Sequence, residues 1–218
     1  MTRQSYPAYA YEKDPSAIYR QSFSIVRGEA DLSHLPDDLH AVAVRLIHAC
    51  GMTDLPQDLA WSENLTASAQ RAFGNGAAIL CDVEMVSHGI IRSRLPSTCD
   101  TVCTLNDTRV PEMAKQLGTT RSAAAVNLWH DRLDGAVVAI GNAPTALFHL
   151  LETIAAGGPK PALVLGFPVG FVGAAESKDA LIDNPFGVPY LAIRGRRGGS
   201  AMAAAAVNAL AAGLPEEG

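Results

Sequence analysis

The chain has 218 residues, of which 48% are hydrophobic and 18% charged, and its formal net charge is −5. The hydrophobic share excludes a disordered chain, and the acidic balance lacks the basic surface of a nucleic-acid-binding protein. No stretch of about 20 apolar residues predicts a membrane span. Residues 1–13 lack the apolar core of a signal peptide. We therefore expect a cytoplasmic protein that binds neither nucleic acid nor membrane.

Before residue 76 the hydrophobic periodicity predicts helices only. The three expected helices are Ser16–Arg27, Asp37–Cys50 and Glu63–Phe73. Asp37 follows a proline and is expected to cap the second helix, and Gly51 is expected to end it. No flexible linker follows this segment, so we expect it to pack on the rest of the chain or on a second subunit.

After residue 76 short apolar runs alternate with helical segments. The runs are Ala77–Cys81, Thr101–Leu105, Ala136–Ile140, Ala162–Leu165 and Tyr190–Ile193. Their residues are continuously apolar, which is typical of parallel strands buried on both faces. The helical segments are Val110–Leu117, Arg121–Leu133, Pro144–Ala156, Ala174–Asp183 and Ser200–Ala212.

This alternation predicts a three-layer α/β/α, flavodoxin-like domain with a five-stranded parallel sheet and a helical N-terminal extension. We expect one domain over residues 1–218, with a helical part at 1–75 and an α/β core at 76–214.

The four cysteines, Cys50, Cys81, Cys99 and Cys103, form no CxxC pair. We interpret them as reduced thiols that pack in the interior of a cytoplasmic protein.

Ligands of open parallel sheets bind beyond the carboxyl ends of the strands. The segment Arg194–Ser200 follows the last run and holds three arginines and three glycines. It is either a solvated basic turn or a carboxylate-binding mouth, to which Arg121 and Ser122 at another helix start could contribute. The glycine-rich segment Gly166–Gly173 is neither a Walker A loop nor a dinucleotide fingerprint. It serves either helix–strand packing or close approach to a flat ligand, with Lys178 as a weaker candidate contact.

His48 is the most informative titratable residue. At about 100° per residue, Leu39, Val42 and Leu46 form the apolar face of the helix 37–50, and His48 points nearly opposite. The helix dipole at the last turn favours the imidazolium form, and a pKa near its ordinary value suits proton transfer at neutral pH. The alternative is an exposed histidine without a role. No HExxH or related spacing predicts a metal site.

Several motifs together resemble the precorrin-8X methylmutase family of cobalamin biosynthesis. The resemblance extends from Tyr9 to Leu210, and its motifs are AIYRQSFSIVR at 17–27, RLIHACG at 45–51, ILCDVEMVSHG at 79–89, TRSAA at 120–124, AIGNAPTAL at 139–147, GFPVGFVGAAESKDAL at 166–181 and RGRRGGSAMA at 194–203. Each motif is modest, but their number, order and spacing make the match specific.

The resemblance implies a cofactor-free isomerase that moves a methyl group from C11 to C12 of precorrin-8X, giving hydrogenobyrinic acid. It implies that His48 is the active-site histidine and that Ser22 and Arg45 contact substrate. Arg121, Ser122, Arg196 and Lys178 are further candidates for binding the carboxylate arms. The family is dimeric with shared active sites, so a homodimer is expected. The alternatives are a non-catalytic carrier that holds hydrogenobyrinic acid and a flavin-binding flavodoxin relative.

Overall fold

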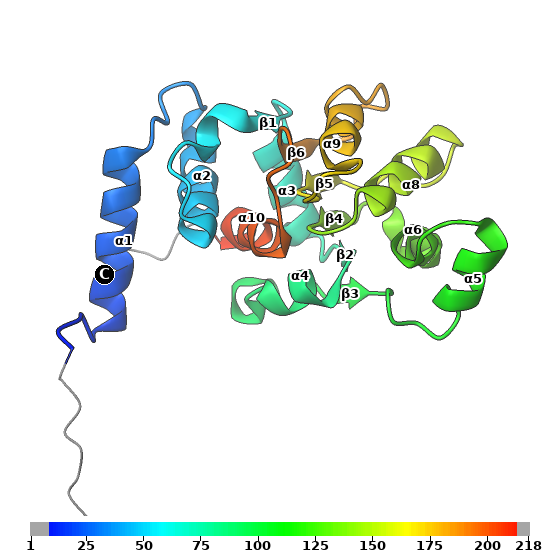
Figure 1. Cartoon of the computed structure of the whole chain (residues 1–218), viewed down its shortest axis with the longest axis horizontal. Coiled ribbons are helices and arrows are strands. Elements are labelled where there is room, and N and C mark those ends of the chain that lie inside the picture. Colours follow the sequence, from blue (N-terminus) through cyan, green and yellow to red (C-terminus); the bar gives the residue numbers. More distant parts are fainter. Residues whose placement is uncertain (1–8, 213–218) are drawn as a thin grey trace, which may run out of the picture.

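The computed structural model describes residues 9–212, so both ends of the expected domain, 1–8 and 213–218, lie outside the described residues. A six-stranded sheet lies between two layers of helices (Figure 1). Its strands are β1 (Leu59–Trp61), β2 (Ile79–Cys81), β3 (Thr101–Cys103), β4 (Val137–Ile140), β5 (Leu163–Gly166) and β6 (Tyr190–Ile193). Their order across the sheet is β1-β6-β5-β4-β2-β3. The three-layer α/β architecture is therefore confirmed.

The last five strands are parallel to one another. Four of them lie within the apolar runs that predicted them, and β5 extends one residue past its run, to Gly166. Across the sheet these five strands follow the order β3-β2-β4-β5-β6. When they are renumbered 1 to 5 along the chain, this is the order 2-1-3-4-5 of doubly wound, flavodoxin-like sheets. The register pairs Cys81 with Cys103 and with Ala139.

The sixth strand, β1, corrects the prediction of helices alone before residue 76. It pairs antiparallel with β6, with Leu59 opposite Ile193 and Trp61 opposite Leu191. A three-residue strand carries too little alternation to be recognised, and its conformation is set by the free edge of β6. The sheet consequently has six strands instead of the five expected.

Alternate residues of the central strands enter two different cores, as expected for a sheet covered on both faces. Ile79, Val137 and Leu163 pack into the core on one face, and Leu80, Val138 and Val164 pack into the core on the other. The first core also includes residues of α1 (Pro15–Glu29), α2 (Asp37–Cys50), α3 (Leu65–Gly74), α4 (Glu84–Gly89) and α10 (Ser200–Ala212). The second includes residues of α6 (Arg121–Val126), α7 (His130–Leu133), α8 (Pro144–Ala155) and α9 (Ala174–Ile182).

Most helices have the expected positions, with one predicted helix divided and three short elements not predicted. The single helix expected at 121–133 is divided into α6, the 3-10 turn η3 (Asn127–Trp129) and α7. The helix α4 and the 3-10 turns η1 (Leu55–Asp58) and η2 (Arg92–Arg94) were not predicted, because each is too short to show periodicity. The remaining helix, α5 (Val110–Leu117), has the predicted bounds and lies at the end of the molecule opposite α1 (Figure 1).

The ends of α2 matter because this helix carries His48. Gly51 has the left-handed conformation, with φ 71°, and ends the helix as predicted. The predicted cap at Asp37 is wrong: Pro36 is the cap residue and Asp37 is the first helical residue. Its carboxylate still lies in the first turn, where the helix dipole stabilises negative charge.

All four cysteines have free thiols, and burial raises the pKa of each. The thiols therefore stay protonated at neutral pH, in keeping with their interpretation as packing residues.

Between residues 9 and 212, no helix is both long enough and apolar enough to cross a membrane.

Candidate active site

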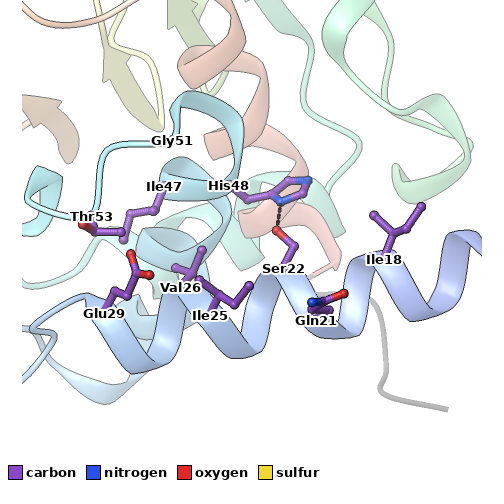
Figure 2. Close-up of a pocket in the computed structure, with 10 residues that line it drawn as sticks. All are labelled: Ile18, Gln21, Ser22, Ile25, Val26, Glu29, Ile47, His48, Gly51 and Thr53. Carbon is purple, nitrogen blue, oxygen red and sulfur yellow. Dashed lines mark hydrogen bonds between the residues drawn. The ribbon is translucent and has the colours of Figure 1, made fainter. Parts of the chain in front are cut away.

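His48 and Ser22 meet where α1 lies against the last turn of α2. The Oγ atom of Ser22 is 2.9 Å from Nδ1 of His48, the bond drawn as a dashed line in Figure 2. His48 is exposed, as its position opposite the apolar face of α2 predicted. The Ser22 hydroxyl therefore fixes the orientation of the ring and leaves Nε2 as the nitrogen for a ligand.

Two aromatic rings of α1 complete the surroundings of the imidazole. The ring of Phe23 packs edge-on at 5.1 Å from the His48 ring, and that of Tyr19 lies at 5.6 Å. Phe23 is buried, whereas Tyr19 is 43% exposed. Ser22 and Phe23 follow Tyr19 by three and four residues, so both are its neighbours on the surface of α1. This spacing is the signal from which the aromatic neighbours of His48 could have been found, although sequence reasoning missed them.

The electrostatics at His48 correct the expectation from the helix dipole. Burial of one side of the ring lowers the pKa of His48 below 6.5, and the positive charge of Arg45 lowers it further. These two effects outweigh the dipole, which favours imidazolium. The neutral imidazole is thus the main form at neutral pH.

Arg45 is a buried cation one turn before His48. Arg45 is only 7% exposed. Its Nη1 atom is buried and has no hydrogen-bond partner within the described part of the chain. Burial lowers the pKa of the Arg45 guanidinium, and the nearby charge of Arg94 lowers it further. Such a group is stabilised by a ligand that brings negative charge, because an unpaired buried charge is costly.

A cavity of about 380 Å³ opens beside Ser22 and His48. As Figure 2 shows, side chains of α1 form one wall and the end of α2 forms the other. Its lining residues are Ile18, Gln21, Ser22, Ile25, Val26, Glu29, Ile47, His48, Gly51 and Thr53. Ligand pockets range from about 300 to 1,000 Å³, so the volume of this cavity lies near the lower end of that range.

The carboxyl edge of the sheet holds the other candidate residues. Arg121 begins α6 and donates from Nη2 to the Leu105 carbonyl at 3.0 Å and to Asn106 Oδ1 at 3.3 Å. Its neighbour Ser122 is half-buried in the same first turn. Arg121 therefore contacts the residues that follow β3, and α6 packs in the helical layer opposite that of α1 and α2.

The arginine-rich segment after β6 has several roles. Arg197 forms ion pairs with Asp54 at 2.8 Å and with Asp58, so it ties the segment to the chain just after α2. Arg194 lies 3.8 Å from Asp179, and Arg196 is exposed, with its guanidinium 5.4 Å from the ring of Phe171. Of the three arginines, Arg196 alone is both exposed and outside an ion pair among the described residues. Arg194 and Arg197 thus pair with aspartates, and Arg196 stays the candidate of this segment for binding a carboxylate.

Lys178 is fully buried, contrary to the expectation of a substrate contact. Its Nζ atom donates to the Arg197 carbonyl at 2.6 Å, and burial lowers the pKa of Lys178 to about 8. Lys178 therefore supports the arginine-rich segment from inside the protein.

Asp82 is a structural carboxylate at the carboxyl end of β2. It is buried directly after β2 and accepts hydrogen bonds from the backbone N–H groups of Gly141, Asn142 and Ala143 at 2.8–3.0 Å. It therefore shapes the turn that leads into α8.

Among residues 9–212, no three His, Cys, Asp or Glu side chains cluster closely enough to hold a metal ion.

The precorrin-8X methylmutase family model matches residues 17–212. The precorrin-8X methylmutase of Pseudomonas aeruginosa is 60% identical over 201 residues, covering 92% of this chain and 97% of the relative. That of a Sinorhizobium species is 56% identical over 205 residues, covering 94% and 98%. The crystal structure of a precorrin-8X methylmutase from Thermus thermophilus superimposes with a TM-score of 0.80 at 38% identity, covering 89% of this chain and 93% of the other. This chain therefore belongs to the precorrin-8X methylmutase family.

Proposed function

We propose that this chain is an isomerase of cobalamin biosynthesis that moves a methyl group from C11 to C12 of precorrin-8X, giving hydrogenobyrinic acid. Membership in the family and the names of the similar relatives support this reaction. The observation that carries the proposal is the exposed imidazole of His48, held by Ser22 at the wall of a cavity.

The methyl group that is transferred comes from the substrate itself, so the reaction needs no methyl donor. The methyl carbon breaks its bond to C11 and forms one to C12 within the same molecule, so product and substrate have the same atoms. His48 exchanges a proton or a hydrogen bond with ring C through Nε2, which selects the tautomer whose π-system accepts the methyl group. Ser22 holds the imidazole at Nδ1, and the protein fixes ring C in the reactive orientation. These roles require no bound cofactor.

The carboxylate arms of the substrate are the groups that cationic side chains recognise. Arg45 contributes a buried guanidinium beside His48. Arg121 and Arg196 lie at the carboxyl edge of the sheet, with Ser122 at the start of α6. We assign these residues to substrate binding, and Lys178 to supporting the segment that carries Arg196.

We also infer that the enzyme works as a homodimer with shared active sites. The cavity of one chain, at about 380 Å³, lies near the lower end of the range for ligand pockets. The exposed side of α1 beside this cavity carries the apolar side chains of Ile18, Tyr19 and Ile25, which a second subunit could cover. A cytoplasmic location fits the four free thiols.

A carrier that holds hydrogenobyrinic acid without turnover is the alternative, and the methylmutase relatives do not favour it. The test is the purified protein incubated with precorrin-8X, with product formation followed by absorbance. We expect wild-type turnover and a loss of at least 100-fold in His48→Ala, because acid–base catalysis contributes about 10²–10⁴-fold. The variant should keep its fold and its affinity for product.

His130→Gln is a matched control, because His130 is an exposed histidine of α7 in the opposite helical layer. It should retain wild-type turnover. Near-wild-type conversion by His48→Ala would remove the role assigned to His48. Binding of product without turnover by the wild-type protein would favour the carrier.

A further inference from the structure

One face of α1 forms a wall of the cavity beside His48 (Figure 2). The residues of this face follow one another along the helix at intervals of three or four positions: Ile18, Ser22, Ile25 and Glu29. Ile18 and Ile25 are 45% and 49% exposed, so about half of each large apolar side chain is in contact with water in the free protein. A ligand with an apolar edge gains free energy by covering them.

The cavity carries a negative charge. Among the described residues, Glu29 is the only acidic side chain that lines it, and no lysine or arginine does. Glu29 is exposed and forms no ion pair within residues 9–212. A ligand that fills the cavity displaces the water that screens this carboxylate, so repulsion of a second carboxylate becomes stronger. The cavity is therefore unsuited to a carboxylate arm of the substrate.

His48 lies along α2 between this cavity and the buried cation Arg45. The lining residues Ile47 and His48 belong to the last turn of α2, and the lining residues Gly51 and Thr53 follow it. Arg45 lies one turn earlier and does not line the cavity. A ligand that reaches His48 therefore meets apolar, acidic surroundings on the side of the cavity.

We propose that the cavity receives the uncharged edge of ring C that carries the migrating methyl group, and that Glu29 determines this orientation by keeping the carboxylate arms out. The inference rests on the proposed function, because the ligand is precorrin-8X. The methyl group leaves C11 for C12, so both carbons belong to the edge that Ile18 and Ile25 cover. A second subunit on the outer side of α1 would close the cavity over this edge.

The variant Glu29→Lys tests the charge, and the neutral methyl ester of hydrogenobyrinic acid separates charge from shape. A lysine at the end of α1 suits the helix dipole, so the variant should fold. It should attract an arm into the cavity. Affinity for hydrogenobyrinic acid should be unchanged or up to about 10-fold higher, in line with a new charge-assisted hydrogen bond, whereas kcat with precorrin-8X should fall at least about 10-fold. Affinity for the ester should stay within about threefold of wild type.

Two further variants serve as controls for Glu29→Lys. Glu29→Gln removes the negative charge without adding a cation, so it should lower kcat less than Glu29→Lys does. Glu152→Lys reverses an exposed charge in the last turn of α8, in the opposite helical layer. It should stay within about threefold of wild type in every measurement.

The variant Ile25→Ala tests the apolar wall. It should weaken binding of the acid and of the ester by the same factor, about 3- to 10-fold, because both ligands lose the same apolar contact. Light scattering should give the wild-type molar mass. Unchanged affinities, or lower affinities accompanied by dissociation into smaller species, would overturn the proposal for this cavity, the latter by assigning Ile25 to a subunit contact.

The result for Glu29→Lys decides the role of this residue. A kcat within about threefold of wild type would overturn it. A lower kcat with equally weakened binding of acid and ester would also overturn it, because the effect would then be structural. A wild-type protein that neither binds hydrogenobyrinic acid nor converts precorrin-8X would instead overturn the proposed function.

Discussion

Replacing Arg45 by methionine should stabilise the free protein while weakening substrate binding. Methionine keeps an unbranched apolar side chain in the space that the arginine stem fills, and it removes a guanidinium of which Nη1 is buried without an acceptor among the described residues. An unsatisfied buried polar group costs about 1–3 kcal/mol, and an exchange that conserves volume usually costs less than about 1.5 kcal/mol.

We therefore expect Arg45→Met to raise the free energy of unfolding by about 1 kcal/mol. For a chain of this size, that corresponds to an increase of about 2–4 °C in the melting temperature. The same variant should bind hydrogenobyrinic acid at least about 10-fold more weakly, since it loses a charge-assisted hydrogen bond. Urea unfolding without ligand and absorbance titration with product measure the two effects separately.

Arg45→Lys is the matched control because it keeps the charge but lacks the planar fork of donors. It should bind product more weakly than wild type and show no increase in stability. The reasoning would be refuted if Arg45→Met lost more than about 1 kcal/mol of stability and kept wild-type affinity. Such a result would mean that the guanidinium supports the fold instead of the substrate.

Three further predictions concern the surroundings of the site. The pKa of His48, followed by NMR, should lie below 6.5 and rise in Arg45→Met. Because the folded protein favours the neutral imidazole, the free energy of unfolding should decrease as the pH falls from about 6.5 through the lowered pKa. A rate step that needs imidazolium should decline as the pH rises through that lowered pKa, and a step that needs the neutral ring should not. Asp82→Ala leaves three backbone N–H groups without their acceptor, two of them on buried residues, and should cost about 3–5 kcal/mol in urea unfolding, more than Asp82→Asn, which keeps one oxygen. Gly198→Ala would place a Cβ atom 2.4 Å from the Phe167 carbonyl oxygen, so it should lower stability by about 1–3 kcal/mol and, by displacing the segment with Arg196, weaken product binding in the same titration.

The parts of the fold that could be predicted are those in which one local pattern decides the structure. The apolar run Ala136–Ile140 became β4 because a strand buried on both faces needs apolar side chains at every position. The helix Asp37–Cys50 has the predicted bounds because its periodicity is clear and Gly51 ends it. The outward direction of His48 followed from the same helical geometry.

The parts that could not be predicted depend on contacts between distant segments. The same helical geometry does not show that Arg45 is buried, because burial depends on the packing of α2 against distant segments such as α10. Likewise, the sequence does not reveal that Arg197 pairs with Asp54 and Asp58, more than a hundred residues earlier. The strand β1 depends in the same way on the edge of β6.

The Arg197 ion pairs also explain how a histidine on an N-terminal helix can belong to a site at the carboxyl edge of the sheet. Ligands of doubly wound folds bind beyond the carboxyl ends of the strands, whereas His48 lies on α2. Arg197 follows β6 and binds Asp54 and Asp58, which follow the end of α2 at Gly51. The buried Lys178 holds the same segment from within through the Arg197 carbonyl. The His48 end of α2 is thereby fixed to a loop at the carboxyl edge, so these two parts of the molecule hold a fixed position relative to each other.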